Sequence, residues 1–532
     1  MKYDVIVAGG GMAGLTAAAF LGKAGKRVLL CEKEDRLGGL VGSFPYKGFT
    51  FDAGIRAVEN SGVLFPMLRA LELDVDFVKS PVSIGIRDAV ARLDSPDSLG
   101  GYRDMLLSQF PEDGAAIDAL MDLVKTAMVY MRVLYGIDNP LFLDLKNDRE
   151  YMKNTLLPWM FKYVTTIGKI KKLNMPVEAC LGAFIRNQAL VDVIAQHFFK
   201  QTPAFFALSY FSLYLDYSYP RGGTGALVSK MEAFIRERGG EIRTGAAVTS
   251  VNPGAKTISD KSGREYGYGR LIWCADQKAL YAQLTGLQAL PGKTAAALRE
   301  RQALLSDKVG GDSVLTLYLT CDMNKAYFEN IHTPHFFYTP RITGLGTLPR
   351  EGIMDGQGRF SQDKTAVFAW LREFLALTTY EISIPVMRDE ALAPAGKTGL
   401  IASTLMDYHL TEHIRAMGWY GDFKALCREA MTDALTGSIY PELAGKITDG
   451  FLSTPLTILE RTGNTDGAIT GWAFTNSVLP AVTSIPGIAK SVRTPIPGVL
   501  QAGQWTYSPS GLPISILTGK LAADRAIKEL KP

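Results

Sequence analysis

The sequence has few of the residues that build disulfide frameworks, metal sites and nucleic-acid surfaces. Five cysteines occur among 532 residues and none forms a CxxC pair, which predicts reduced thiols in the cytoplasm rather than a disulfide framework. The five histidines include His409 and His413 at helical spacing, but no third ligand completes a recognisable pattern, so we predict no metal site. The net charge of +4 is small for this length and gives no reason to expect nucleic acid as a partner.

Long apolar runs are also scarce. The segment 201–215 is apolar and aromatic, but it is too short for a transmembrane helix and is bracketed by Lys200 and Asp216. It is either core or the wall of an apolar tunnel. A strand expected from Tyr3 leaves no room for a signal peptide, so we do not expect secretion. A hydrophobic content of 47% and a charged content of 21% are near globular averages, which argues against both disorder and a multi-span membrane protein.

The first forty residues have the pattern of a βαβ unit. An apolar run at 3–7 leads into a glycine cluster at 9–14, and a segment rich in alanine follows at 15–25. A second apolar run at 27–30 then leads to Glu32. This order predicts a strand, a tight turn, a helix and a second strand that ends at an acidic residue.

The residue types in this unit suit a bound dinucleotide. Gly9 allows a sharp turn, Gly11 removes a side chain that would block the pyrophosphate, and Gly14 lets the helix pack closely on the strand. The helix N-terminus presents free N–H groups and a partial positive charge to the anion. Glu32 can accept hydrogen bonds from the ribose hydroxyls. We therefore predict that this unit binds a dinucleotide.

Motifs beyond this unit carry a resemblance to a known family. Glu32 is followed by Arg36 and by the pair Gly38-Gly39, and residues 48–54 read Gly-Phe-Thr-Phe-Asp-Ala-Gly. In these features the sequence resembles the flavin-containing amine oxidase superfamily, and in particular its branch of phytoene desaturases, carotenoid isomerases and retinol saturases. The resemblance implies FAD rather than NAD as the cofactor.

The same resemblance extends to the end of the chain. Motifs at 219–225, 241–251, 388–396 and 467–471 have counterparts in this branch, and 497–513 matches the segment that completes the flavin end of the site. The resemblance implies an α/β fold in which a Rossmann-like FAD-binding domain is interleaved with a mixed α+β substrate-binding domain that carries an apolar helical lid. The expected boundaries are 1–80, 216–300 and 485–532 for the FAD-binding domain, and 81–215 and 301–484 for the substrate-binding domain.

Carried onto the matching positions, the resemblance implies an FAD site that draws on both ends of the chain. The N-terminus of the last helix would direct positive charge at the pyrimidine side of the flavin. Cys274 stands where relatives have asparagine, so we assign it no role. The residues expected to bind the cofactor are Gly9, Gly11, Met12, Ala13, Gly14, Glu32, Lys33, Arg36, Gly38, Gly39, Leu40, Val248, Ala275, Gly503, Gln504, Gly511, Leu512 and Pro513.

The activity implied by the resemblance is that of an FAD-dependent oxidoreductase. It would transfer hydride between flavin N5 and carbon–carbon bonds of a carotenoid-like, retinoid-like or other long apolar lipid. A redox-neutral polyene isomerase, an amine oxidase and a lipid carrier without turnover are the alternatives. No His, Asp or Glu stands out as a general base. Arg56 is unusual at its position and could balance charge on the flavin or hold a substrate carboxylate, with a surface salt bridge as the alternative.

The segment 151–175 combines basic and aromatic residues. It carries five lysines and no acidic residue, and it interleaves Trp159, Phe161 and Tyr163. Basic side chains beside aromatic ones are typical of a helix at a membrane surface. A solvated cationic face on a lid helix is the alternative. The sequence therefore suggests a cytoplasmic protein with peripheral membrane contact as a hypothesis.

Overall fold

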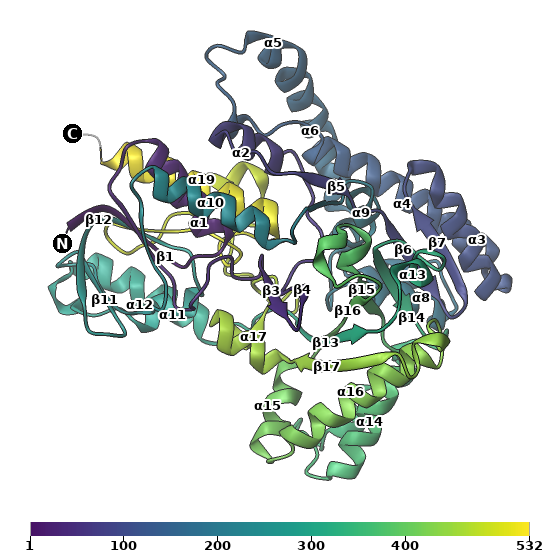
Figure 1. The fold of residues 1–532 in the computed structure, drawn as a ribbon. Coiled ribbons are helices and arrows are strands. Elements are labelled where there is room, and N and C mark those ends of the chain that lie inside the picture. The colour runs from purple at the N-terminus through teal and green to yellow at the C-terminus, as the bar shows by residue number, and fades with distance from the viewer. Residues whose placement is uncertain (1, 531–532) are drawn as a thin grey trace.

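The computed structural model describes residues 2–530, which form two seven-stranded sheets with helices packed around them (Figure 1). The chain passes between the two sheets several times. The first sheet takes its strands from 2–31, 241–273 and 499–501, and the second from 82–93 and 313–453. The segments that supply the two sheets therefore alternate along the chain, and the domain boundaries expected from the sequence stay a prediction.

The first sheet is parallel at its centre. Its strands are β1 (Lys2–Ala8), β2 (Val28–Cys31), β9 (Glu241–Arg243), β10 (Val248–Asn252), β11 (Thr257–Asp260), β12 (Glu265–Trp273) and β18 (Val499–Gln501). The order is β10-β11-β12-β1-β2-β9, and β18 pairs with the end of β12. Ala8 pairs with Cys31 on one side and with Trp273 on the other, so the carboxyl ends of the parallel strands meet at one edge. Ligands of such sheets bind at this edge.

Helices cover both faces of the first sheet. They are α1 (Met12–Lys23), α10 (Gly225–Glu237), α11 (Gln277–Ala282), α12 (Gly292–Ser306) and α19 (Leu512–Glu529). Val5 and Val7 share a core with α1, α10 and α19, which lie together over one face (Figure 1). Ile6 and Leu29 share a second core with α11 and α12. Apolar residues on both faces of a strand are typical of a parallel sheet buried on both sides.

The second sheet has one apolar face and one face of mixed polarity. Its strands are β6 (Val82–Ile86), β7 (Ala89–Leu93), β13 (Ser313–Cys321), β14 (His335–Thr339), β15 (Tyr380–Ser383), β16 (Thr398–Met406) and β17 (Ile447–Ser453), in the order β17-β13-β16-β15-β14-β6-β7. Phe336, Tyr338 and Ile382 pack against α14 (Lys364–Leu377), α15 (Tyr408–Ala416) and α16 (Tyr420–Thr436). Because side chains alternate along a strand, His335 and Glu381 belong to the opposite face.

A layer of helices from residues 99–214 packs on the face of the second sheet that carries His335. It consists of α3 (Leu99–Gln109), α4 (Gly114–Tyr135), α6 (Leu157–Lys171), α7 (Val177–Gly182), α8 (Gln188–Ala195) and α9 (Ala204–Tyr214). Leu208 and Phe211 of α9 lie in its core, whereas Tyr210 and Leu213 line a cavity. The two interpretations of the segment 201–215 therefore apply to different faces of one helix. Among residues 2–530, no helix is both long and apolar enough to cross a membrane.

A hairpin joins the two sheets and positions the residues after it. It consists of β3 (Ser43–Tyr46) and β4 (Phe49–Asp52), and Phe51 packs on Tyr318 of the second sheet with ring centroids 5.4 Å apart. Buried Asp52 accepts hydrogen bonds from the Tyr219 hydroxyl at 2.7 Å and the Thr224 backbone at 2.9 Å. The other α-helices and strands in residues 2–530 are α2 (Leu64–Leu71), β5 (Phe77–Lys79), α5 (Arg149–Tyr151), β8 (Ser218–Pro220), α13 (Lys325–Glu329), α17 (Pro455–Thr462) and α18 (Ile488–Ser491).

Candidate cofactor and substrate site

A cavity of about 560 Å³ runs from the carboxyl ends of the parallel strands to the face of the second sheet that carries His335 and Glu381. A volume of this size suits a bound small molecule or cofactor. We call the part lined by Gly9, Gly11 and Glu32 the nucleotide end, and the part lined by Tyr214 and Glu381 the inner end. The nucleotide end lies at the first sheet and the inner end at the second, so the cavity connects the two sheets.

The glycines of the loop after β1 have distinct structural roles at the nucleotide end. Gly9 has a φ of 106°, and a Cβ there would lie 2.7 Å from the carbonyl oxygen of Cys274. A Cβ on Gly14 would collide with the Gly9 carbonyl, so this position sets how closely α1 approaches the strand. A Cβ on Gly11 would meet nothing within 4 Å and would project into the cavity. Gly11 therefore leaves space for a ligand rather than for the protein itself.

Glu32 is held in a fixed position at the end of β2. One carboxylate oxygen accepts a hydrogen bond from the Gly10 backbone at 2.6 Å, and the other accepts one from the Glu34 backbone at 2.9 Å. Burial raises the pKa of this carboxyl, while these backbone donors act in the opposite direction. Each oxygen has a further lone pair, so the carboxylate can still accept hydrogen bonds from a ligand.

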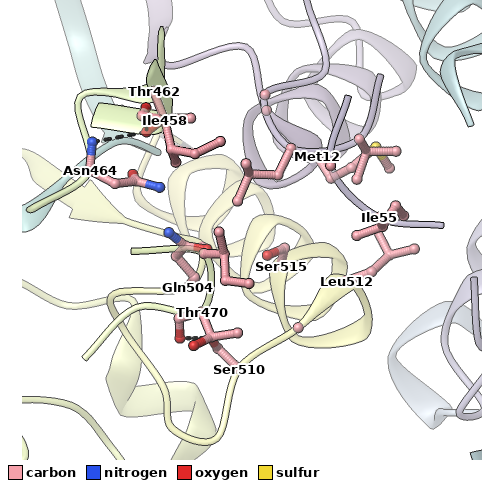
Figure 2. Close-up of a pocket in the computed structure, with 18 of the residues that line it drawn as sticks. Met12, Ile55, Ile458, Thr462, Asn464, Thr470, Gln504, Ser510, Leu512 and Ser515 are labelled. Carbon is pink, nitrogen blue, oxygen red and sulfur yellow. Dashed lines mark hydrogen bonds between the residues drawn. The ribbon is translucent and has the colours of Figure 1, made fainter. Parts of the chain in front are cut away.

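The start of α19 forms the middle of the cavity. Gly511 precedes the helix and no side chain caps its first N–H groups. Figure 2 shows Met12 and Ile55, from the N-terminal part of the chain, near Leu512 of this helix. Gly503, with a φ of 99°, is held by a 2.9 Å hydrogen bond from its backbone N–H to the Thr518 hydroxyl. Segments more than 450 residues apart in sequence thus form one wall.

The structure brings most of the residues expected to bind the cofactor to this one cavity. Of the residues named from the sequence, all except Gly14 and Pro513 line it. Gly14 packs against the loop after β1, and Pro513 lies in the first turn of α19. Contact with a cofactor stays a prediction for all eighteen residues. The residues that line the cavity are Gly9, Gly11, Met12, Ala13, Glu32, Lys33, Arg36, Gly38, Gly39, Leu40, Val248, Ala275, Gly503, Gln504, Gly511 and Leu512.

Arg56 is buried and lines the cavity. It is 3% exposed, and its guanidinium donates hydrogen bonds to the carbonyl oxygens of Asp52, at 2.9 Å, and Gly54, and to the Ser403 hydroxyl at 3.1 Å. Its Nε has no partner, and in the part of the chain that the structure describes no carboxylate lies within ion-pair distance of it. The surface salt bridge considered for Arg56 is therefore wrong, because the side chain is inside the protein.

The inner end contains titratable residues that the sequence did not indicate. Nε2 of His335 lies 3.0 Å from Oε1 of Glu381. His197 contacts the Tyr214 hydroxyl at 2.6 Å, and burial lowers the pKa of His197 to about 3. In the middle of the cavity, near the start of α19, burial raises the pKa of Glu59 to about 7. These residues are far apart in sequence and form no motif, so only the pairing of the strands and helices could reveal the cluster.

The nucleotide end has the features that a dinucleotide requires. Two helices, α1 and α19, begin at the cavity without a side-chain cap, and free N–H groups at a helix start bind anions such as pyrophosphate. Gly11 keeps the approach open and Glu32 provides the acidic residue for the ribose. Fold and site together define a dinucleotide-binding protein.

The chain belongs to the family described as flavin containing amine oxidoreductase. The model of this family matches residues 12–310, which is more than half of the 532 residues. The match confirms the resemblance found in the motifs. It also confirms the predicted cofactor, FAD, and the predicted class of enzyme, an oxidoreductase.

Individual relatives agree with this family. The chain is 30% identical over 283 residues to all-trans-retinol 13,14-reductase of Macaca fascicularis, a match that spans 50% of this chain and only 44% of the relative. It is 23% identical over 555 residues to the lycopene-forming phytoene desaturase of Pseudescherichia vulneris, which covers 100% of both chains. The structure of cyclohexylamine oxidase from Brevibacterium oxydans IH-35A has the same fold, with a TM-score of 0.59, 15% identity and 100% of both chains covered.

Proposed function

We propose that the protein desaturates or saturates carbon–carbon bonds of a carotenoid-like, retinoid-like or other long apolar lipid. The observation that carries this proposal is the continuity between the nucleotide end of the cavity and an aromatic inner end. A bound flavin supplies hydride acceptance or donation. Relatives named for retinol reduction and for phytoene desaturation support the same class of substrate.

The walls of the inner end suit a flat, apolar chain. Phe198, Tyr210, Leu213 and Tyr214 line it from the helical layer, and Phe337 lines it from β14. The ring of Tyr214 lies 5.3 Å from that of Phe337, so the two walls already contact each other. Aromatic side chains offer large apolar surfaces and keep water away from the reacting bond. This chain's own contribution is therefore to position the lipid and to exclude solvent.

Product analysis with defined lipids tests the proposal. Purified flavoprotein is incubated without oxygen with phytoene while its flavin is oxidised, and with all-trans-retinol after its flavin has been reduced with dithionite, and product masses are measured. A gain or loss of two hydrogens supports saturation or desaturation, whereas an isomer of unchanged mass supports the redox-neutral alternative. Cyclohexylamine serves as the amine substrate, and its oxidation without any change in either lipid would contradict the proposal. The variant Gly11→Val, whose side chain would occupy the nucleotide end, is the flavin-depleted control.

We also propose that α6 contacts a membrane surface. Of the large apolar side chains that are exposed in the described structure, most lie on or just after this helix, and Leu157, Met160, Phe161 and Val164 share one face at i, i+3, i+4 and i+7. Figure 1 shows α5 and α6 extending away from the rest of the molecule. An exposed apolar stripe of this kind marks an interaction site. All five lysines of 151–175 are exposed around it, which suits anionic lipid. Flotation with lipid vesicles tests this contact.

A further inference from the structure

Two short segments of the chain pair beside the cavity and hold Glu59 next to Tyr217. Val58 and Ser218 exchange two backbone hydrogen bonds, each of 2.9 Å, which makes them an antiparallel pair. Glu59 follows Val58 and Tyr217 precedes Ser218, so these two residues lie opposite each other with their side chains on the same face. Val58 and Ser218 are buried, whereas Glu59 and Tyr217 line the cavity.

The backbone around this pair is fixed by a further hydrogen bond. The Asp216 carboxylate accepts it from the backbone N–H of Asn60 at 2.8 Å, so the residues next to Glu59 and Tyr217 also connect the two segments. An oxygen of the Glu59 carboxyl lies 3.8 Å from where a Cβ on Gly511 would be, which places the pair near the start of α19. A ligand group at this point therefore meets side chains that a rigid frame holds in place.

The polar atoms of this pair are open to the cavity and have no partner in the protein. Within residues 2–530, neither the Glu59 carboxyl nor the Tyr217 hydroxyl forms a hydrogen bond or an ion pair with another residue, and the same holds for the hydroxyl of Tyr210. All three residues are partly exposed and line the cavity, and none of these oxygens is among the unpartnered atoms that are buried from solvent. The rings of Tyr210 and Tyr217 both pack on Tyr214, with centroids 5.8 Å and 5.7 Å away. We call Glu59, Tyr210 and Tyr217 the polar cluster.

Several other polar side chains of the inner end are already paired within the protein. The amide of Gln196 donates to a backbone carbonyl at 2.9 Å and to the Thr379 hydroxyl at 3.2 Å. The Thr404 hydroxyl bonds to another threonine at 2.7 Å, and the Tyr214 hydroxyl contacts a ring nitrogen of His197 at 2.6 Å. Because native proteins rarely leave polar groups unpaired, the polar cluster is where a polar group of a ligand is expected.

The charges around the polar cluster favour a neutral group that both donates and accepts. Burial raises the pKa of Glu59 to about 7, and the Asp216 carboxylate acts in the same direction, so near neutral pH the carboxyl is present as donor and as acceptor. Burial raises the pKa of Tyr210 and of Tyr217, and the carboxyl groups of Glu59 and Glu381 raise it further, so both phenols keep their protons. A ligand carboxylate would meet like charges here, and a hydrocarbon would leave the polar cluster unpaired.

We propose that the polar cluster selects a long apolar lipid that ends in a hydroxyl group, and that Glu59 and Tyr217 are the specificity-determining residues that hydrogen-bond this hydroxyl. This inference rests on the proposed function and narrows its substrate from apolar lipids in general to alcohols. The aromatic walls of the inner end contact the apolar chain and accept an alcohol or a hydrocarbon alike. Selectivity comes from the polar cluster, because a site that hydrogen-bonds a hydroxyl rejects the analogue that lacks it.

Four ligands that share one polyene chain test this selectivity. They are all-trans-retinol and its counterparts in which CH3, COOH or CH2NH2 replaces the terminal CH2OH group. Their dissociation constants are measured with the oxidised flavoprotein from the quenching of tryptophan fluorescence, which needs no turnover. We expect the alcohol to bind about 5-fold to 150-fold more tightly than the methyl compound, the effect of leaving one buried polar group unpaired. The carboxylate compound should also bind more weakly than the alcohol.

Variants assign this preference to the polar cluster. Tyr217→Phe removes one hydroxyl with little change in shape, and Glu59→Leu removes the carboxyl. Each should lower the preference for the alcohol about 2-fold to 10-fold, and the double variant should bind the alcohol and the methyl compound within about twofold of each other. Tyr102→Phe, buried outside this cavity, and Glu112→Leu, on the surface, are the matched controls and should keep the full preference. If Glu59→Leu does not fold, Tyr217→Phe still decides the test.

The outcomes separate this inference from the proposed function. If the alcohol binds no more tightly than the methyl compound, or if both variants keep the full preference, the inference is overturned. Tighter binding of the amine than of the alcohol also overturns it, since the polar cluster would then be a cation site. So does a loss of flavin in Glu59→Leu with the alcohol preference intact, because Glu59 would then belong to the cofactor site. The proposed function is judged by product mass and fails if no lipid changes, whatever the dissociation constants are.

Discussion

Replacing Phe161 and Val164 by aspartate should detach the protein from lipid vesicles. The two side chains are 73% and 69% exposed on one face of α6. Burying a whole Val or Phe side chain contributes about 1.5–3 kcal/mol, so about 70% of that for each residue gives about 2–4 kcal/mol for the pair. The double variant should therefore bind vesicles about 30-fold to 1,000-fold more weakly.

The lysines of the same segment should act only on anionic lipid. Each lysine near such a surface contributes about 1 kcal/mol, so changing Lys169, Lys171 and Lys172 to glutamine together should weaken binding to phosphatidylserine-containing vesicles about 150-fold. Binding to pure phosphatidylcholine should not change, because no surface charge attracts the lysines there. Matched exposed lysines elsewhere, such as Lys261 and Lys446, provide the control.

Flotation through a density gradient measures both effects. Flavin content and melting temperature of each variant establish that the fold is intact, which is expected because the substituted side chains are exposed. If the unmutated protein does not float with either vesicle, the membrane proposal is refuted. If the variants of the α6 lysines and of the control lysines lose vesicle binding equally, the assignment of binding to this helix is refuted.

Three further predictions follow from buried positions. Gly11→Val should lower flavin content at least tenfold, measured by visible absorbance, with little change in the melting temperature of the apoprotein. Gly14→Val should instead lower the melting temperature, because a Cβ on Gly14 collides with the backbone and a Cβ on Gly11 does not. Arg56→Ala should lower turnover about 10-fold to 150-fold, the loss expected for one charge-assisted hydrogen bond, and an unchanged flavin spectrum and rate would dismiss a role for Arg56. His332 is 1% exposed, and burial lowers its pKa from 6.5 to about 4. The unfolded chain binds the proton first, so stability should fall by up to about 3 kcal/mol from pH 6.5 to pH 4, and urea titrations should show a smaller fall in His332→Asn.

Local sequence was sufficient to predict the nucleotide end. The roles of Gly9, Gly11 and Gly14 depend on φ, on side-chain size and on the next few residues, and the structure shows a tight turn, an open approach and close packing at these positions. The sequence also placed Glu32 correctly at the end of the second strand, because the end of the apolar run 27–30 marks where that strand stops. What the sequence did not indicate is that both of its oxygens already accept hydrogen bonds from backbone N–H groups.

The inner end could not be read from the sequence in the same way. His335 and Glu381 are separated by α14 and come together only because β14 and β15 pair in one particular register. A shift of one residue would turn one of them to the apolar face. The interpretation of Arg56 as a surface ion pair failed for a related reason, since its burial depends on the second sheet, whose Ser403 lies almost 350 residues further along the chain.

The sequence by itself determined the cofactor-binding unit, the family and the class of chemistry, because these depend on short segments whose residues contact their neighbours or a phosphate directly. Tertiary structure alone decided which polar groups line the cavity. The environment of Arg56, Glu59 and His335 is set by elements from distant parts of the chain, and burial and charge from those elements determine which group holds a proton. Protonation is a property of the assembled cavity, since it depends on the solvent that the fold removes and on the charges that it brings together.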